Sequence, residues 1–320
     1  MRIERHGLRA LYLASLSLVA CTALRLPGSP RESGNWSAGT AAHEVPVAGM
    51  SRSFLLHVPA NAPRTMIGLR AKFPLVIALH GSNGTSEDIR RASRFDSIAE
   101  ARRFLVAYPQ GSKGVLGLAP SDWNVGTCCG AAHQENLDDV GFILGVIARV
   151  SEHVSVDPGR IYVAGFSDGG RMAYHLACQA AGRIAAIGVV AGSLLDAQCS
   201  PDRPMPVIAF HGTADTQVAY DEMALTRVSR DVPAWGRSLP PSIRFWSAHD
   251  GCRDAVARGI SAHVVRTVIA PCDGSDLALY TIDGGVHGWP GEAGGGGAAP
   301  RMSEIDASDL MIRFFLDHSR

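Results

Sequence analysis

Charged residues are scarce in this chain of 320 residues. Asp, Glu, Lys and Arg together make up 19% of it, and Lys72 and Lys113 are the only lysines. The 30 basic residues balance the 30 acidic ones, which argues against a nucleic-acid partner because such binding usually needs a basic patch. Hydrophobic residues make up 46% of the sequence. This length and apolar content suit one large α/β domain, since such domains often exceed about 200 residues undivided.

Metal-binding patterns and internal repeats are also missing from the sequence. No Cys-x-x-Cys pair stands with histidines at zinc-finger spacing, which argues against a zinc site. The acidic pair Asp138 and Asp139 could suggest a metal ligand, but a cap at the start of a helix is the more common explanation. We therefore expect no metal and no other cofactor.

The sequence has no apolar run at its start that is long enough for a permanent membrane helix. Three arginines precede an apolar run over residues 10–20, which predicts a secretory signal peptide over residues 1–20. The run ends in Leu-Val-Ala-Cys, which resembles the bacterial lipobox, so we predict lipidation at Cys21. The alternative is an ordinary signal peptide with an unrelated cysteine. Either reading places the protein outside the cytoplasm, and a lipid anchor would be its only membrane contact.

The segment after the predicted signal peptide is rich in Pro, Gly, Ser and Ala. We interpret residues 21–48 as the lipobox cysteine followed by a flexible tether. The folded domain would then occupy residues 49–320.

Six cysteines remain when Cys21 is set aside. They are Cys128, Cys129, Cys178, Cys199, Cys252 and Cys272. An even number in an exported protein suggests disulfides, although the sequence alone does not choose among the possible pairings. Proximity favours Cys178–Cys199 and Cys252–Cys272. The adjacent Cys128 and Cys129 would form a vicinal disulfide or pair with other cysteines.

Seven short apolar runs have the character of β-strands. They lie at residues 54–58, 74–80, 104–108, 161–165, 186–190, 206–211 and 277–282. Several are continuous runs of Val, Ile, Leu and Ala, as expected for strands covered by helices on both faces. Helical patterns lie between them, and two begin at Asp138 and near Ser303. This order predicts an α/β fold with a mostly parallel sheet. Residues 221–262 are less regular and suggest an insertion beside the sheet.

One serine lies in a glycine-rich turn between a strand and a helix. Gly165-Phe166-Ser167-Asp168-Gly169 fits the pattern G-x-S-x-G. At such a turn the serine hydroxyl projects above the sheet, and the glycines prevent collisions with the neighbouring strand and helix. Ser167 is therefore a candidate nucleophile, and the alternative is a simple glycine-rich connection.

A serine hydroxyl is a weak nucleophile and needs a base with an orienting acid. In this fold the acid precedes the base in the chain, and both follow the serine. Asp215 follows the strand 206–211, and His287 follows the strand 277–282. Both would lie at the carboxyl edge of the sheet, where ligand sites of open α/β sheets gather. We predict a triad of Ser167, Asp215 and His287, with His80 and His211 packing nearby.

Acyl transfer also needs hydrogen-bond donors for the oxyanion that develops on the substrate. The backbone N–H of Asp168 is one candidate because it directly follows the nucleophile. The second candidate is the backbone N–H of Ser82, in the loop after the strand 74–80. Removing such a donor raises the barrier by about 3 kcal/mol.

Seven segments together resemble a known family. They are "PLVIALHGSNG", "AYPQG", "WNVGTCCG", "DDVGFI", "RIYVAGFSDGGRMA", "HGTAD" and "GGVHGWPG". In this order and spacing they resemble the bacterial polyhydroxybutyrate depolymerase-like esterases, which include the LpqC-type lipoproteins and are similar to feruloyl and acetylxylan esterases. The resemblance covers about residues 50–318. It implies an α/β-hydrolase fold and hydrolysis of carboxylic esters, with Ser167, Asp215 and His287 at the positions of the family triad.

One residue departs from the pattern of this family. The position after the nucleophile is often asparagine or alanine in the family and is Asp168 here. A carboxylate near an oxyanion is unfavourable unless it is paired or points away.

Trp123, Asn124 and Trp289 are our candidates for substrate contact, since aromatic faces suit sugar rings, aryl acids and polyester chains. Packing is the alternative for the tryptophans. The expected substrates are small or oligomeric esters, either short polyhydroxyalkanoates or feruloyl and acetyl esters of plant polysaccharides. A protein that only binds is the alternative from another class.

Overall fold

The computed structural model describes residues 36–60, 72–114, 116–196, 198–221, 236, 238–292 and 300–320. The predicted signal peptide, Cys21 and the first part of the predicted tether lie outside these residues. Among the described residues, no helix is long and apolar enough to cross a membrane.

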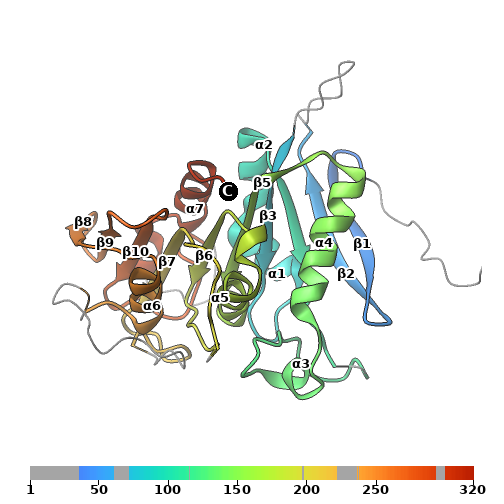
Figure 1. Cartoon of the computed structure of the whole chain (residues 1–320), viewed down its shortest axis with the longest axis horizontal. Coiled ribbons are helices and arrows are strands. Elements are labelled where there is room, and N and C mark those ends of the chain that lie inside the picture. The colour runs from blue at the N-terminus through green and yellow to red at the C-terminus, as the bar shows by residue number, and fades with distance from the viewer. Residues whose placement is uncertain are drawn as a thin grey trace, which may run out of the picture. The chain divides into compact units, whose positions relative to one another are not determined.

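A large sheet runs through the described part of the chain (Figure 1). Its strands are β1 (Gly39–Val47), β2 (Met50–Val58), β3 (Phe73–Leu79), β4 (Leu105–Pro109), β5 (Val156–Phe166), β6 (Ala186–Val190), β7 (Val207–Gly212), β8 (Ala255–Gly259), β9 (Val264–Ile269) and β10 (Leu277–Ile282). Their spatial order is β1-β2-β4-β3-β5-β6-β7-β10-β9-β8. The central strands from β4 to β10 are parallel. Antiparallel strands extend the sheet at both edges.

Helices cover both faces of this sheet. They are α1 (Ser86–Ser93), α2 (Phe95–Arg102), α3 (Gly130–Gln134), α4 (Asp139–His153), α5 (Asp168–Ala180), α6 (Pro241–His249) and α7 (Ala307–Leu316), with short 3-10 turns at Ala181–Arg183 and Pro300–Ser303. Buried residues of α4, α5 and α6 share one hydrophobic core, and those of α1, α2 and α7 share the other. In Figure 1, α4 and α5 cover the face turned toward the viewer.

The strand β3 shows why the central strands are apolar throughout. All of its residues are buried. Leu75, Ile77 and Leu79 face one core, whereas Val76 and Ala78 face the other. Successive side chains of a strand point to opposite faces, so a strand covered on both faces must be apolar at every position. The predicted α/β fold with a mostly parallel sheet is confirmed.

The tether predicted over residues 21–48 is too long. Residues 39–47 form β1, which pairs antiparallel with β2 from Gly39 opposite Val58 to Val47 opposite Met50. His43 and Val45 of this strand are buried. The sequence shows no continuous apolar run for this strand, because the strand lies at the edge of the sheet and only alternate residues need to be apolar. The folded domain therefore includes residues that we had assigned to the tether.

The region 221–262 contributes to the domain more than its sequence suggests. The helix α6 buries Ile243 and Trp246 in the core. The strand β8 pairs with β9 and forms the edge of the sheet beyond β10. We predicted neither β8 nor β9, because the residues of β8 are mostly exposed and only half of those of β9 are buried. The last helix begins at Ala307, after its N-cap Asp306, and not near Ser303.

Three disulfides join the six remaining cysteines. The pairs are Cys178–Cys199, Cys252–Cys272 and the adjacent Cys128–Cys129. The first two are the pairings that proximity favoured, and the third is the vicinal alternative. Cys178 lies on α5, so its disulfide ties that helix to the segment after β6.

Loss of the Cys178–Cys199 disulfide should destabilise the domain. A crosslink that closes a loop of this size stabilises a protein by about 3 kcal/mol, chiefly by restricting the unfolded chain. We expect the double variant C178A/C199A to lose about that much free energy of unfolding in urea titrations. The Cys178–Cys199 disulfide would have no stabilising role if the variant and the parent unfolded at the same urea concentration.

Candidate active site

Ser167 occupies a tight turn between the end of β5 and the start of α5. Its φ is 55° and its ψ is −117°, a combination of backbone angles that residues other than glycine rarely adopt. A Cβ on Gly165 would lie 2.0 Å from the backbone oxygen of Gly169. A Cβ on Gly169 would lie 2.3 Å from the backbone oxygen of Leu79. Glycine is therefore required at both positions, and the turn has the geometry of a nucleophile elbow.

Asp215 and His287 meet at the carboxyl edge of the sheet. Asp215 follows β7 and His287 follows β10, and these two strands are parallel neighbours. The His287 Nδ1 atom lies 2.8 Å from the Asp215 Oδ2 atom, within hydrogen-bond distance. Asp215 Oδ1 accepts from the backbone N–H groups of Gln217 and Val218. These bonds fix the carboxylate, which in turn orients the imidazole.

The carboxyl group of Asp215 is strongly acidic. Burial opposes its ionisation, but hydrogen bonds from two histidine rings and two backbone N–H groups outweigh this effect and hold its pKa well below the ordinary value. The second histidine is His211, whose Nε2 atom lies 3.5 Å from Asp215 Oδ2 and 2.8 Å from the backbone oxygen of Val218. Asp215 is therefore ionised at neutral pH and can stabilise a positive charge on His287.

The His287 ring lies beside the elbow. Its centroid is 4.9 Å from the ring centroid of Phe166, the residue before Ser167. Among the described residues, no hydrogen bond joins Ser167 to His287. Bonds of this kind are often long in unliganded enzymes and tighten when substrate binds. The structure thus forms the acid–base pair and places the base next to the serine segment.

The loop after β3 also lies close to Ser167. A Cβ on Gly81 would be 3.1 Å from the Ser167 Cβ atom, so this loop passes directly beside the serine. The Ser82 hydroxyl donates to Asp122 Oδ1. His80 is buried, and its Nε2 atom accepts from the backbone N–H of Gly111. The loop that carries the predicted second oxyanion donor is therefore held next to the elbow.

The two tryptophans predicted as substrate contacts are packing residues. Trp123 is fully buried, and its Nε1 donates to the backbone oxygen of His80 at 2.9 Å. Trp289 is also buried, and its Nε1 donates to the Ser308 hydroxyl at 2.9 Å. Neither ring has an exposed face, so our expectation of substrate contact is wrong for both. Asn124 is half-buried and donates to the backbone oxygen of Leu137, which fixes its own loop.

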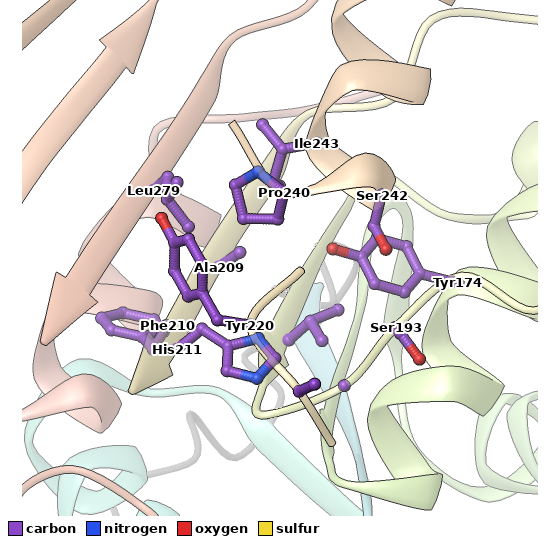
Figure 2. Close-up of a pocket in the computed structure, with 13 residues that line it drawn as sticks. Tyr174, Ser193, Ala209, Phe210, His211, Tyr220, Pro240, Ser242, Ile243 and Leu279 are labelled. Carbon is purple, nitrogen blue, oxygen red and sulfur yellow. The ribbon is translucent and has the colours of Figure 1, made fainter. Parts of the chain in front are cut away.

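A cavity of about 270 Å³ lies next to the loop after β3. Its lining residues are His80, Gly81, Ser82, Asn83, Gly84, Asp88, Ile89, Arg91, Ala92, Phe166 and Glu292. Phe166, Ile89 and Ala92 give it apolar walls, whereas Asp88, Arg91 and Glu292 are charged. A second cavity, beside His211 and Tyr220, holds only about 10 Å³ (Figure 2), the room of roughly one water molecule. The larger cavity is therefore the candidate substrate pocket.

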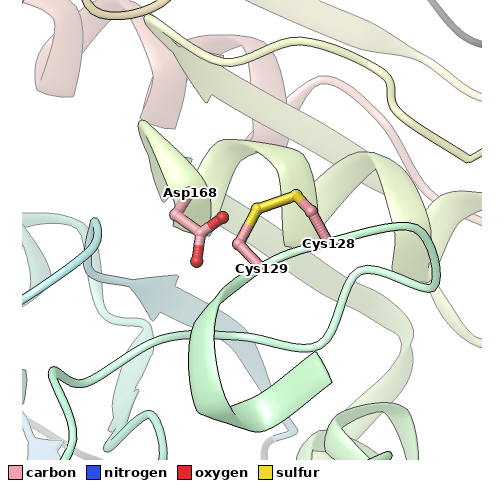
Figure 3. A group of neighbouring side chains, drawn as sticks. All are labelled: Cys128, Cys129 and Asp168. Carbon is pink, nitrogen blue, oxygen red and sulfur yellow. A yellow bond between two sulfur atoms is a disulfide. The ribbon is translucent and has the colours of Figure 1, made fainter. Parts of the chain in front are cut away.

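Asp168 is buried at the start of α5 and faces the loop that carries Trp123. Its Oδ2 atom accepts from the backbone N–H of Trp123 at 3.1 Å. Figure 3 shows the carboxyl group next to the disulfide of Cys128 and Cys129. The three side chains offer ligand atoms within 4.8 Å of one another, but the disulfide leaves no thiolate to bind a metal.

Burial raises the pKa of Asp168 from its ordinary value of 3.8 to about 7. The Trp123 N–H and the positive charge of Arg171 oppose this shift, and the negative charges of Asp122 and Asp139 add to it. At neutral pH the group is therefore poised between its protonated and ionised forms.

This raised pKa makes the stability of the domain depend on pH. The folded state binds the Asp168 proton more tightly than the unfolded state, so the free energy of unfolding falls as the pH rises from about 4 to about 7. The effect is on the order of 4 kcal/mol at most. We expect Asp168→Asn to be more stable than the parent at pH 8, with a difference that shrinks toward pH 4, in urea titrations at both pH values. A constant difference across that range would contradict the pKa shift.

The parallel sheet, the strained strand–serine–helix turn and the Asp–His pair at the carboxyl edge define an α/β-hydrolase. The fold matches solved esterases, among them the acetyl xylan esterase from Aspergillus awamori, with a TM-score of 0.57 at 16% identity over 82% of this chain and 93% of that chain. The chain belongs to the esterase PHB depolymerase family, whose model matches residues 53–236.

Curated relatives agree with this membership. A protein of Nocardia uniformis subsp. tsuyamanensis named as an esterase, NocK, is 31% identical over 86% of this chain and 80% of its own length. Feruloyl esterase B of Piromyces equi is 32% identical over 67% of this chain, which spans 39% of that protein. The poly(3-hydroxybutyrate) depolymerase of Ralstonia pickettii is 25% identical over 89% of this chain and 54% of its own length. The resemblance noted in the sequence is confirmed, and it supports hydrolysis of carboxylic esters.

Proposed function

We propose that this protein is an exported serine esterase that works through a covalent acyl-enzyme on Ser167. The observation that carries the proposal is the strained φ of 55° at Ser167, on an elbow beside the hydrogen-bonded pair of Asp215 and His287. A protein that only binds esters would not need to hold a serine in this conformation.

The geometry supports a specific order of proton transfers. His287 Nδ1 donates to Asp215, which leaves the Nε2 lone pair to take the proton of the Ser167 hydroxyl. Ser167 Oγ attacks the ester carbonyl, and the backbone N–H groups of Asp168 and Ser82 donate to the resulting oxyanion. His287 then protonates the leaving alcohol. Water hydrolyses the acyl-enzyme by the reverse sequence of proton transfers and restores Ser167.

The substrate class that we propose is short esters of the polyhydroxyalkanoate type. Similarity to a poly(3-hydroxybutyrate) depolymerase supports this choice. Feruloyl or acetyl esters of plant polysaccharides are the alternative, which similarity to feruloyl esterase B favours.

Product release from methyl ferulate and from 3-hydroxybutyrate oligomers, measured side by side, tests the substrate class. We expect faster release of hydroxybutyrate. Faster release of ferulate would support the alternative. Activity on neither, with Ser167 still labelled by a fluorophosphonate, would contradict both substrate classes and retain the mechanism.

Export and lipid anchoring are part of the proposal. Three disulfides support an oxidising compartment, and the Leu-Val-Ala-Cys segment supports lipidation of Cys21. We expect the full chain expressed in a bacterial host to incorporate labelled palmitate and the variant Cys21→Ala to lose the label. Equal labelling of both would contradict lipidation at Cys21.

A further inference from the structure

The two proposed oxyanion donors come from separate segments of the chain. One is the first residue of α5, Asp168, and the other is Ser82 in the loop after β3. An oxyanion hole stabilises the transition state only if both donors lie about 3 Å from the same oxygen. The two segments must therefore be held at a fixed separation, and the sequence motif does not show how.

A pair of hydrogen bonds through one residue connects the two segments. The Asp168 carboxylate accepts from the backbone N–H of Trp123 at 3.1 Å. The indole Nε1 of the same Trp123 donates to the backbone oxygen of His80 at 2.9 Å. His80 is two residues before Ser82 and is buried. The connection thus leads from one donor segment through Trp123 to the other.

Trp123 is itself held in place by its surroundings. Its side chain is fully buried, and its backbone oxygen accepts from the N–H of Cys129 at 3.2 Å. The Val125 N–H donates to the backbone oxygen of Cys128 at 2.7 Å and closes the turn of residues 125–128, and the disulfide of Cys128 and Cys129 follows this turn directly. The neighbouring Asp122 accepts from the Ser82 hydroxyl. A fixed Trp123 can transmit the position of one segment to the other.

We propose that the Asp168 side chain is a positioning residue that, through Trp123, holds the two oxyanion-donor segments at the separation that catalysis requires. The inference rests on the proposed function, because it concerns the same oxyanion hole. It adds a role for the one residue that departs from the pattern of the family. The side chain does not touch the reacting atoms and acts only through its acceptor oxygen.

The hydrogen-bonding pattern of Asp168 shows which property of the side chain matters. Its Oδ1 atom is buried and has no hydrogen-bond partner within the described part of the chain. Arg171, Asp122 and Asp139 supply the nearby charges, two of them negative. The surroundings therefore do not favour a carboxylate over a neutral group. An amide oxygen at the Oδ2 position would accept from Trp123 equally well, whereas a methyl group would not.

The test compares Asp168→Ala, Asp168→Asn and a matched control in the full-length protein. Asp250 provides the control because it is also 1% exposed and also accepts a backbone N–H at 3.1 Å, from Met205. Met205 precedes β7, so this bond lies at the amino edge of the sheet, opposite the elbow. Steady-state hydrolysis of p-nitrophenyl butyrate gives kcat and KM, and thermal unfolding gives Tm.

We expect Asp168→Ala to lower kcat by about tenfold or more, with KM within about threefold of the parent. The interaction is needed only when the oxyanion forms, so the loss falls on kcat. We expect Asp168→Asn to recover at least about tenfold in kcat over Asp168→Ala. We expect Asp250→Ala to lower Tm and leave kcat unchanged.

Equal kcat values for Asp168→Ala and the parent would overturn the inference, as would equal losses in Asp168→Ala and Asp168→Asn. If Asp168→Ala fails to fold, Trp123→Phe takes its place, because it removes the bond to His80 and keeps the backbone N–H of residue 123. An unchanged kcat in Trp123→Phe would overturn the inference equally. Failure of the proposed function is distinguishable, since the parent protein would then neither hydrolyse the ester nor react with a fluorophosphonate.

Discussion

Ser167→Ala should abolish ester hydrolysis in a protein that remains folded. We expect kcat for p-nitrophenyl butyrate to fall about 10⁵-fold or more, since removal of a catalytic serine leaves only binding and oxyanion stabilisation. Alanine keeps the Cβ atom and loses only the hydroxyl, so the elbow is retained. We expect Tm to change by no more than about 2 °C, as for a substitution that alters no packing.

Ser151 on α4 provides a control for this substitution. Its hydroxyl donates to the backbone oxygen of Ile147. Ser151 lies near the end of α4, which leads to the start of β5, whereas the elbow follows the end of that strand. We expect Ser151→Ala to keep the kcat of the parent. Residual activity in Ser167→Ala above about 1% of the parent would mean that another group is the nucleophile.

Asp215→Asn should have the second-largest effect. The amide keeps the size of the carboxyl group but carries no charge, so it neither fixes the imidazole tautomer nor stabilises the imidazolium. We expect kcat to fall about 10⁴-fold, while KM for p-nitrophenyl butyrate stays within about threefold. Steady-state kinetics at pH 8 measures both.

Another His–Asp pair, of His175 and Asp196, serves as a matched control. His175 Nδ1 lies 2.9 Å from Asp196 Oδ2, nearly the same distance as in the pair of His287 and Asp215. The pair of His175 and Asp196 joins α5 to the loop after β6 and has no part in the proposed mechanism. We expect Asp196→Asn to retain the kcat of the parent. Comparable losses in Asp196→Asn and Asp215→Asn would indicate a general effect of removing a buried carboxylate.

The elbow and the acid–base pair could be predicted from the sequence because each residue follows a strand that the sequence marks clearly. A serine at a strained turn needs glycine at positions 165 and 169, and these residues are visible in the sequence. The positions of Asp215 and His287 follow from the strands before them, since parallel strands end at the same edge of a sheet. The central strands are continuous apolar runs in the sequence, so the points at which they end could be located.

Other features depend on contacts that no motif marks, and they are not visible in the sequence. The strand β1 is identified only by its pairing with β2, because few of its residues are buried. The buried indole N–H groups of Trp123 and Trp289 find acceptors on His80 and Ser308, and no motif in the sequence marks these partners. The role of Asp168 follows from its bond to Trp123. A pattern of residue types gives no information about such partners.

The most direct test of the central claim is to identify the residue that a fluorophosphonate modifies in the full-length protein. Labelled protein is digested, and the modified peptide is sequenced by mass spectrometry. We predict a single adduct on Ser167, formed at a rate that falls sharply in Asp215→Asn. An adduct on another residue, or ester hydrolysis that continues after Ser167 has been fully labelled, would contradict the proposal that this protein is a serine esterase acting through Ser167.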